Sequence, residues 1–325
     1  MHLFSKLEPM KLLFSLSLLL CTFLVSAQGF THTETTLAVE DKTTKAVITL
    51  PDGAGPFPAV IIVAGSGATD LDGNSRGLPG KNNSLKMLAE GLAEKGYASL
   101  RYNKRILAGF GETGLTFDNF VTDAINAYKM LDEHPKTGKI GFAGHSQGSL
   151  VCMLAAQQVD AAFFISIAGP GLAFDEVISK QLKANPANPP VVISKSEEIM
   201  AELKKGNEVS EVPPYLMSLF RPSVQGFIGS WMKYSPVAEI AKLKIPVLVI
   251  NGTTDIQVSV EDAEALHKAA TTKKVLLTID KMNHVLKDAP ADRQGNIATY
   301  SDESLPLSIG LLAGIDSFLG VVLGQ

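Results

Sequence analysis

The most constraining feature of this sequence is a Gly-x-Ser-x-Gly pentapeptide that lies between an apolar run and a helical stretch. The pentapeptide is Gly144-His145-Ser146-Gln147-Gly148. Residues 139–143 have the pattern of a short buried strand, and residues 149–158 that of a helix. A serine on such a turn takes a strained backbone conformation with its hydroxyl at the mouth of a sheet, and the small flanking residues let neighbouring backbone pass. We therefore interpret Ser146 as a nucleophile rather than as part of an ordinary Gly/Ser turn.

The rest of the chain alternates apolar runs with amphipathic stretches. We expect strands at residues 58–64, 97–102, 140–143, 161–168, 245–251 and 275–279. We expect helices at residues 85–95, 118–132, 149–158 and 263–270. An earlier segment, 33–50, alternates polar and apolar residues and indicates an antiparallel strand pair. This rhythm predicts an α/β fold, with a mainly parallel sheet and helices on both faces.

Two segments depart from that rhythm. Residues 171–242 are helical in period but broken by prolines, and they lie between two strands of the sheet. We interpret them as an inserted helical cap on a single α/β domain, residues 28–325. The last segment, 305–323, is almost wholly apolar, but Pro306 and Asp316 interrupt it, which favours a packed terminal helix over a membrane span.

The first 27 residues have the pattern of a secretory signal. Lys11 precedes an apolar run at residues 12–24, and the small residues Val25-Ser26-Ala27 follow it. An uncleaved anchor is the weaker alternative, because the run is short for a bilayer about 30 Å thick. Met10 is an alternative start to Met1. We expect cleavage after Ala27, a periplasmic or secreted mature chain, and no stable membrane anchor.

Charge and cysteine content exclude several function classes. The formal net charge is −4 and no long basic run occurs, which argues against a nucleic-acid partner. Of the two cysteines, Cys21 leaves with the leader, so the mature chain has no intrachain disulfide. Cys152, on the helix after Ser146, is expected to be a small buried hydrophobe. No zinc-ligand spacing and no phosphate-binding glycine loop occurs, so we expect neither a metal nor a cofactor. The sequence does not indicate an oligomeric state.

A serine hydroxyl needs a base, which is usually a histidine because its pKa near 6.5 lets it take and return a proton. The histidines of the mature chain are His32, His134, His145, His267 and His284. His284 lies in a loop directly after the last expected strand, and loops at the carboxyl ends of parallel strands hold the sites of such sheets. His145, beside Ser146, is expected to point elsewhere. We therefore expect His284 to be the base.

The imidazole needs a carboxylate that holds its tautomer. Asp255 follows the buried strand that ends at residue 251, so it also lies at a strand's carboxyl end. Asp280 is a rival, but it lies too close to His284 in sequence to orient it easily. An Asx-turn cap is the alternative role for Asp255. For the developing oxyanion we expect two backbone N–H donors, those of Gln147 and of Ser66 in the loop after residue 63.

Two further motifs support a family resemblance. Residues 63–74 resemble the Gly-Ser-Gly-Pro-x-Asp-Arg-Asp-Gly oxyanion loop of a bacterial esterase subgroup, and residues 101–105 are similar to its Arg-Tyr-Asp-Lys-Arg segment. The chain thus looks like an α/β-hydrolase of the branch that contains bacterial carboxylesterases, monoglyceride lipases and serine aminopeptidases. The resemblance runs from about residue 46 to the C-terminus, least of all in the cap. It implies that Ser146, Asp255 and His284 are nucleophile, orienting acid and base, in the order expected for this fold.

The sequence departs from that subgroup at several loop positions. Ala64-Gly65 stands where many relatives have His-Gly, and Ala68 and Leu71 replace a proline and an arginine. Asn103 replaces an aspartate. We also expect a structural charge network under the site, formed by Asp70, Asp72, Arg101 and Arg105.

The function most consistent with these patterns is an exported carboxylesterase that hydrolyses small to medium acyl esters through an acyl-enzyme intermediate. Apolar cap residues either line an acyl pocket or pack the cap onto the sheet: Leu216, Met217, Phe220, Phe227, Trp231 and Met232. One alternative is a peptidase or aminopeptidase, which needs an anionic cap group for a free amine. The candidates are Glu197, Glu198, Glu202, Glu208 and Glu211. Another alternative is a catalytically inactive binding protein.

Overall fold

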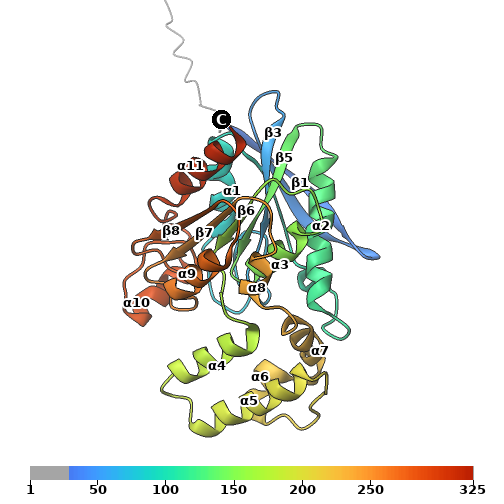
Figure 1. Ribbon diagram of the computed structural model, residues 1–325, viewed down its shortest axis with the longest axis vertical. Coiled ribbons are helices and arrows are strands. Elements are labelled where there is room, and N and C mark those ends of the chain that lie inside the picture. Colours follow the sequence, from blue (N-terminus) through green and yellow to red (C-terminus); the bar gives the residue numbers. More distant parts are fainter. Residues whose placement is uncertain (1–28, 325) are drawn as a thin grey trace, which may run out of the picture.

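A single eight-stranded sheet organises the fold of this computed structural model, which describes residues 29–324 (Figure 1). The strands are β1 (Phe30–Val39), β2 (Lys42–Pro51), β3 (Phe57–Val63), β4 (Ala98–Tyr102), β5 (Thr137–His145), β6 (Phe164–Ile167), β7 (Val247–Gly252) and β8 (Lys274–Ile279). Their order across the sheet is β1-β2-β4-β3-β5-β6-β7-β8. The β1–β2 and β2–β4 pairs are antiparallel and the other five are parallel, which confirms the mainly parallel sheet expected from the sequence.

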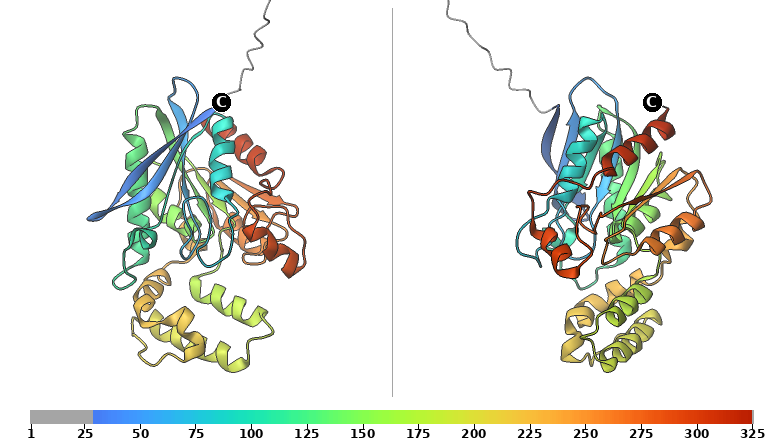
Figure 2. Two further views of the ribbon diagram at one scale, coloured as in Figure 1. Left: turned by 180° about the vertical axis from the view of Figure 1, so that it is seen from behind. Right: turned by 90° about the vertical axis from the view of Figure 1, so that its left-hand side faces the viewer.

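Helices cover both faces of this sheet (Figure 2). They are α1 (Ser84–Glu94), α2 (Phe117–Asp132), α3 (Gln147–Ala156), α4 (Phe174–Ala184), α5 (Pro190–Lys204), α6 (Met217–Phe220), α7 (Pro222–Trp231), α8 (Pro236–Ile240), α9 (Val260–Ala269), α10 (Arg293–Ala298) and α11 (Leu311–Leu323). Three short 3₁₀ helices are η1 (Arg105–Ala108), η2 (Pro214–Leu216) and η3 (Thr299–Ser301). Helices α2, α3, α8 and α9 pack on one face, and α1 and α11 lie side by side on the other.

The apolar runs of the central strands are continuous because both faces are covered. In β3, Ile61 and Val63 belong to the core under α2 and α3, whereas Val60 and Ile62 belong to the core under α1 and α11. Successive side chains of a strand point to opposite faces, so each residue of such a strand is buried. Full burial of each of these side chains contributes about 1.5–3 kcal/mol.

The cap consists of helices α4 to α7, inserted between β6 and β7, and lies below the sheet in the view of Figure 1. It has an apolar core of its own, whose buried members are Ile199, Met200, Leu203, Leu216, Phe220, Ile228 and Met232. Helix α8 belongs instead to the sheet layer, where it packs against α3 and α9.

Several element boundaries differ from the sequence-based expectation. The terminal helix α11 begins at Leu311 rather than near residue 305, because Pro306 and the left-handed Gly310 (φ 94°) precede it. Helix α3 begins at Gln147, directly after Ser146, two residues earlier than expected. Within residues 29–324, no helix is both long and apolar enough to cross a membrane. The expected leader, residues 1–27, lies outside the described residues.

Candidate active site

Ser146 occupies the one residue between the end of β5 and the start of α3. Its φ is 53° and its ψ −122°, a conformation that costs of order 1–3 kcal/mol and persists only where the surroundings impose it. Here they do: a Cβ at Gly144 would lie 2.3 Å from the carbonyl oxygen of Gly148, and one at Gly148 would lie 2.2 Å from that of Val63. Only glycine fits at either position, so the pentapeptide spacing follows from backbone packing around Ser146.

Asp255 and His284 lie in the loops that follow β7 and β8, and they form a buried hydrogen-bonded pair. His284 Nδ1 lies 2.8 Å from Asp255 Oδ2, and their side chains are 6% and 0% exposed. The other oxygen, Oδ1, accepts the N–H groups of Gln257 (2.8 Å) and Val258 (2.9 Å). Asp255 therefore forms an Asx turn through one oxygen and contacts His284 through the other. The two roles considered for it from the sequence, turn cap and partner of the histidine, are compatible.

Backbone contacts join the two loops that carry this pair. The N–H of Thr254 donates to the carbonyl of Met282 (3.1 Å), and its hydroxyl donates to the carbonyl of Lys281 (2.7 Å). The rival carboxylate, Asp280, accepts the hydroxyl of Thr253 at 3.1 Å, and its side chain makes no hydrogen bond to His284 in the described part of the chain. Of the two carboxylates, Asp255 is thus the one hydrogen-bonded to the imidazole.

His145 connects the turn that carries Ser146 with the His284 loop. Its Nε2 donates to the backbone carbonyl of His284 at 2.7 Å, and the two ring centroids are 4.8 Å apart. Burial, reinforced by the charge of His284, lowers the pKa of His145 from 6.5 to about 3, so the ring is neutral with its proton on Nε2.

The contacts of residues 29–324 include no hydrogen bond between Ser146 and His284. In unliganded enzymes that bond is often loose and tightens with substrate.

The two expected oxyanion donors flank Ser146. Gln147 is the first residue of α3, so its N–H has no acceptor within the helix. The loop after β3 runs directly beside Ser146, since a Cβ at Gly65 would lie 3.2 Å from that of Ser146. Ser66, Ser146 and Gln147 line one cavity together.

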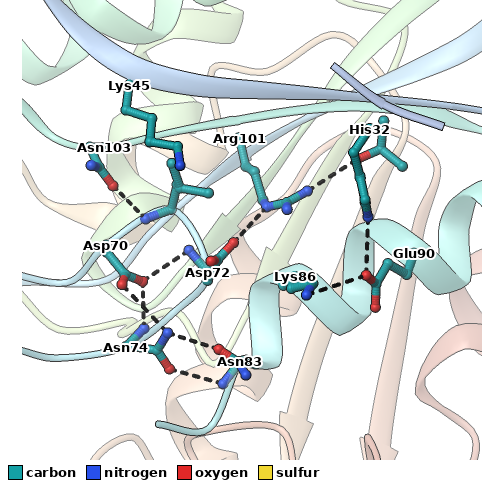
Figure 3. Close-up of polar contacts among 12 residues, drawn as sticks. His32, Lys45, Asp70, Asp72, Asn74, Asn83, Lys86, Glu90, Arg101 and Asn103 are labelled. Atoms are coloured by element: carbon teal, nitrogen blue, oxygen red, sulfur yellow. Dashed lines mark hydrogen bonds and ion pairs between the residues drawn. The ribbon is translucent and has the colours of Figure 1, made fainter. Parts of the chain in front are cut away.

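Side chains of the loop itself, and that of Asn103 just after β4, brace the segment that follows Ser66 (Figure 3). Asp70 Oδ1 accepts the N–H groups of Asp72 (2.9 Å) and Asn74 (2.8 Å). The Oδ1 of Asn103, the residue that replaces the subgroup's aspartate, accepts the N–H of Leu71 at 2.8 Å. Leu71 itself is buried, which explains why an apolar residue stands there. The loop is therefore ordered despite its departures from the subgroup.

The expected charge network is only half correct. Arg101 Nε donates to Asp72 Oδ1 at 3.0 Å, as expected (Figure 3). Arg105, however, pairs with Asp123 on α2 (2.6 Å) and with Glu40. Residue 105 opens the 3₁₀ helix after β4, and this turn directs its side chain toward α2 and away from the loop.

The cavity beside Ser146 has a volume of about 150 Å³ and mostly apolar walls. Its apolar lining includes Leu150, Leu172, Phe174, Ile178, Trp231 and Pro236. Of the six cap residues considered from the sequence, Trp231 lines this cavity, where its ring centroid is 4.4 Å from that of Phe174. Leu216, Phe220 and Met232 are in the core of the cap, Phe227 packs against α2, and Met217 is 43% exposed.

A wider cavity of about 560 Å³ adjoins the first one. Both are lined by Pro170, Leu172, Val177, Gln181, Gln257 and Val258. The wider cavity extends between α4 and α10 toward Lys180 and Arg293. In the described chain none of the five cap glutamates lines either cavity, and three of them pair with lysines: Glu197, Glu198 and Glu202. An amine-binding carboxylate in the cap is therefore not favoured.

Sequence reasoning missed Lys104, whose side chain contacts both segments that carry the expected oxyanion donors. Its Nζ donates to Gln147 Oε1 at 2.9 Å and to the carbonyl of Gly65, and burial lowers its pKa to about 7.

Cys152 is fully buried, and burial raises the pKa of its thiol, in agreement with its expected role as a small hydrophobe. Residues 29–324 contain no group of three or more His, Cys, Asp or Glu side chains arranged to hold a metal ion.

Comparison with known proteins finds an esterase among the relatives of this chain. No protein-family model matches the chain. Esterase EstD of Thermotoga maritima is 32% identical over 243 residues, which cover 74% of this chain and 57% of EstD, so the chain spans little more than half of that relative.

Solved structures share the fold at lower identity. Est1E from Butyrivibrio proteoclasticus has a TM-score of 0.59 at 17% identity, over 90% of this chain and 99% of its own. The hypothetical protein PA2218 from Pseudomonas aeruginosa has a TM-score of 0.58 at 16% identity, over 91% and 94%. Esterase Pf2001 from Pyrococcus furiosus has a TM-score of 0.52 at 18% identity, over 91% and 93%.

Proposed function

We propose that this chain, which is 32% identical to esterase EstD over 243 residues and shares the fold of Est1E, is a serine carboxylesterase of the α/β-hydrolase superfamily. Its substrates are small to medium acyl esters, cleaved through an acyl-enzyme intermediate. The observation that carries this proposal is the buried His284–Asp255 pair, held against the turn that presents Ser146 to an apolar cavity. Fold alone does not assign a reaction, so the proposal depends on this site.

The reaction needs only the chain's own groups and water. Ser146 Oγ attacks the ester carbonyl while His284 Nε2 takes its proton, and Asp255 stabilises the resulting imidazolium. The tetrahedral oxyanion accepts the N–H groups of Gln147 and Ser66, each worth about 10²–10³ in rate. Its collapse breaks the C–O bond, and the leaving alcohol takes the proton from His284. A water deprotonated by His284 then attacks the acyl-enzyme, releases the acid and regenerates Ser146.

The two adjoining cavities suggest how the substrate is divided. An apolar cavity of 150 Å³ holds a group about the size of benzene, so the narrow cavity suits an acyl chain of up to about six carbons. The wider cavity of about 560 Å³, with polar side chains at its rim, suits the alcohol part of the ester. This division favours short and medium acyl chains on alcohols of varied size.

A panel of p-nitrophenyl esters, from acetate to decanoate, tests the proposal on wild type and Ser146→Ala. We expect Ser146→Ala to lose at least about 10³-fold in kcat and to lose labelling by a fluorophosphonate probe. Equal rates for the two proteins would overturn the proposed mechanism. Turnover of aminoacyl-naphthylamides above that of esters would instead identify a peptidase.

Residues 1–27 are proposed to be a secretory signal cleaved after Ala27, which gives a periplasmic or secreted enzyme. Expression of the full chain in a bacterial host, followed by fractionation and N-terminal sequencing, tests this. We expect the exported protein to begin at Gln28. Recovery of an uncleaved chain in the membrane fraction would contradict the assignment.

A further inference from the structure

We propose that Lys104 is a positioning residue for the oxyanion hole, which orients the Gly65–Ser66 peptide and the Gln147 residue so that their backbone N–H groups face the substrate carbonyl. This inference rests on the proposed esterase function and deepens it. It assigns a role to a buried lysine that neither the proton transfer nor the nucleophilic step uses.

Lys104 lies two residues after the end of β4, and its side chain is only 4% exposed. Its Nζ contacts the carbonyl of Gly65 and Gln147 Oε1, and lies 5.3 Å from the ring centroid of Phe120. Within residues 29–324 it forms no ion pair with a carboxylate, in contrast to the neighbouring Arg105. Burial of a lysine without a counter-charge is costly, and its partners here are the two segments that carry the proposed oxyanion donors.

Peptide geometry explains how the contact with Gly65 acts on Ser66. In a planar trans peptide the C=O and the following N–H point in opposite directions. Because the Gly65 carbonyl points at Lys104, the Ser66 N–H of the same peptide points away from Lys104, and Ser66 lines the cavity beside Ser146. A hydrogen bond to the carbonyl also polarises the peptide and strengthens its N–H as a donor.

Gln147 is held in a corresponding way. Its side-chain Oε1 accepts from Lys104 at 2.9 Å, while its backbone N–H opens α3 next to Ser146. Gln147 is 82 residues from Gly65 in sequence, and the side chain of Lys104 donates to both. The residue before it, Asn103, binds the N–H of Leu71 farther along the same loop. Consecutive residues after β4 thus fix two points of the loop that carries Ser66.

The test compares kcat and KM of Lys104→Met, which removes the ammonium at similar volume, with those of wild type on p-nitrophenyl butyrate. We expect kcat to fall about 10²-fold with KM within about twofold, because the lost interaction acts on the transition state. Trifluoromethyl ketones form an oxyanion when they bind to Ser146. Their inhibition constants should rise in the variant in proportion to the fall in kcat/KM. A Lys104→Met enzyme with wild-type kcat would overturn the inference.

Lys287→Met is the matched control. Lys287 is also fully buried, and its Nζ donates to the carbonyl of Leu305 and to Met87 Sδ. We expect it to lower the unfolding midpoint as much as Lys104→Met does, with kcat within about threefold of wild type. Equal losses of kcat in both variants would mean that Lys104 affects activity only through general packing, as another buried lysine does. That result would overturn the inference.

A second variant covers the case in which Lys104→Met does not fold. Gln147→Leu removes the side-chain acceptor but keeps the backbone N–H, and we expect kcat to fall about tenfold with KM unchanged. An unchanged kcat in Gln147→Leu would overturn the inference. Failure of the proposed function gives a different result from failure of this inference. If the proposed function is wrong, Ser146→Ala is as active as wild type. If only the inference is wrong, Ser146→Ala is inactive and Gln147→Leu and Lys104→Met keep their kcat.

Discussion

The carboxylate of Asp255 holds His284 in one tautomer. Its Oδ2 lies 2.8 Å from Nδ1 of His284 and can only accept, so in the neutral ring Nδ1 carries the proton and Nε2 the lone pair. That is the form in which an imidazole takes a proton from a serine. The second oxygen, Oδ1, is engaged by the N–H groups of Gln257 and Val258, so the carboxylate cannot rotate freely.

Asp255→Asn should separate catalysis from folding. The amide oxygen can replace Oδ1 in the Asx turn, which places the NH₂ group opposite His284 Nδ1. Two donors cannot pair, so the imidazole moves its proton to Nε2 and can no longer act as a base. We expect kcat to fall about 10⁴-fold with an unfolding midpoint close to wild type, measured by ester turnover and urea unfolding.

Asp280→Asn provides the neighbouring control, because Asp280 bonds to Thr253 rather than to the histidine. We expect its kcat to stay within about twofold of wild type. A loss in Asp280→Asn as large as that in Asp255→Asn would show that Asp255 had been wrongly assigned.

Trp231→Leu should shift the acyl-chain preference toward longer esters. The indole ring closes the 150 Å³ cavity together with Phe174, so a smaller side chain extends the space beside Ser146. We expect wild type to be fastest with acyl chains of about four to six carbons, and the variant to gain several-fold in kcat/KM for octanoate relative to butyrate. The p-nitrophenyl ester panel measures both.

Met217→Ala is the matched control for that change. Met217 is also an apolar cap residue, but it is 43% exposed and does not line this cavity. Its chain-length profile should match that of wild type. The same profile in Trp231→Leu would place the acyl chain elsewhere, for example in the wider cavity.

Cys152 should resist alkylation in the folded enzyme. The thiol is fully buried and burial raises its pKa, so the reactive thiolate is scarce and inaccessible. In a chain that begins at Gln28 it is the single cysteine, so mass spectrometry after iodoacetamide treatment reads it directly. We expect no adduct and full esterase activity in buffer, and complete labelling in urea. Rapid labelling with loss of activity would point to a cysteine at the site.

The parts of the site that sequence patterns predicted all follow strands. Ser146 comes directly after β5, and Asp255 and His284 lie in the loops that follow β7 and β8; the carboxyl ends of such parallel strands meet at one edge. Local hydrophobic pattern therefore sufficed to group them.

The local hydrophobic pattern could not predict the contacts of Lys104 and Arg105, because their partners are distant in sequence. Lys104 bonds to residues 39 and 43 positions away, and Arg105 reaches Glu40, 65 positions away. A charged residue after a strand does not reveal which of several neighbouring segments it will face. The cap posed the same problem: its helical period marks apolar faces, but not whether a face such as that of Trp231 borders the cavity or the core of the cap.

His145 should make the stability of the enzyme depend on pH below neutrality. Its pKa is lowered from 6.5 to about 3 because burial and the charges of His284 and Lys104 disfavour protonation more than Asp255 and the bond to the His284 carbonyl favour it. Below pH 6.5 the unfolded chain therefore binds a proton that the folded chain does not. As the pH is lowered from 6.5 to 3, the free energy of unfolding should decrease, and His145 should contribute about 1.4 kcal/mol of this decrease per pH unit.

His145→Gln isolates this contribution, since its amide can still donate to the His284 carbonyl but does not titrate. Urea unfolding at pH 7, 6, 5 and 4 should give a slope against pH that is smaller in the variant by that amount, whereas above pH 7 the two slopes should agree. Carboxylates titrate in both proteins, so the difference between the slopes belongs to residue 145. Identical slopes over the whole range would mean that the His145 ring takes up a proton as readily in the folded as in the unfolded chain, and is not held neutral against His284.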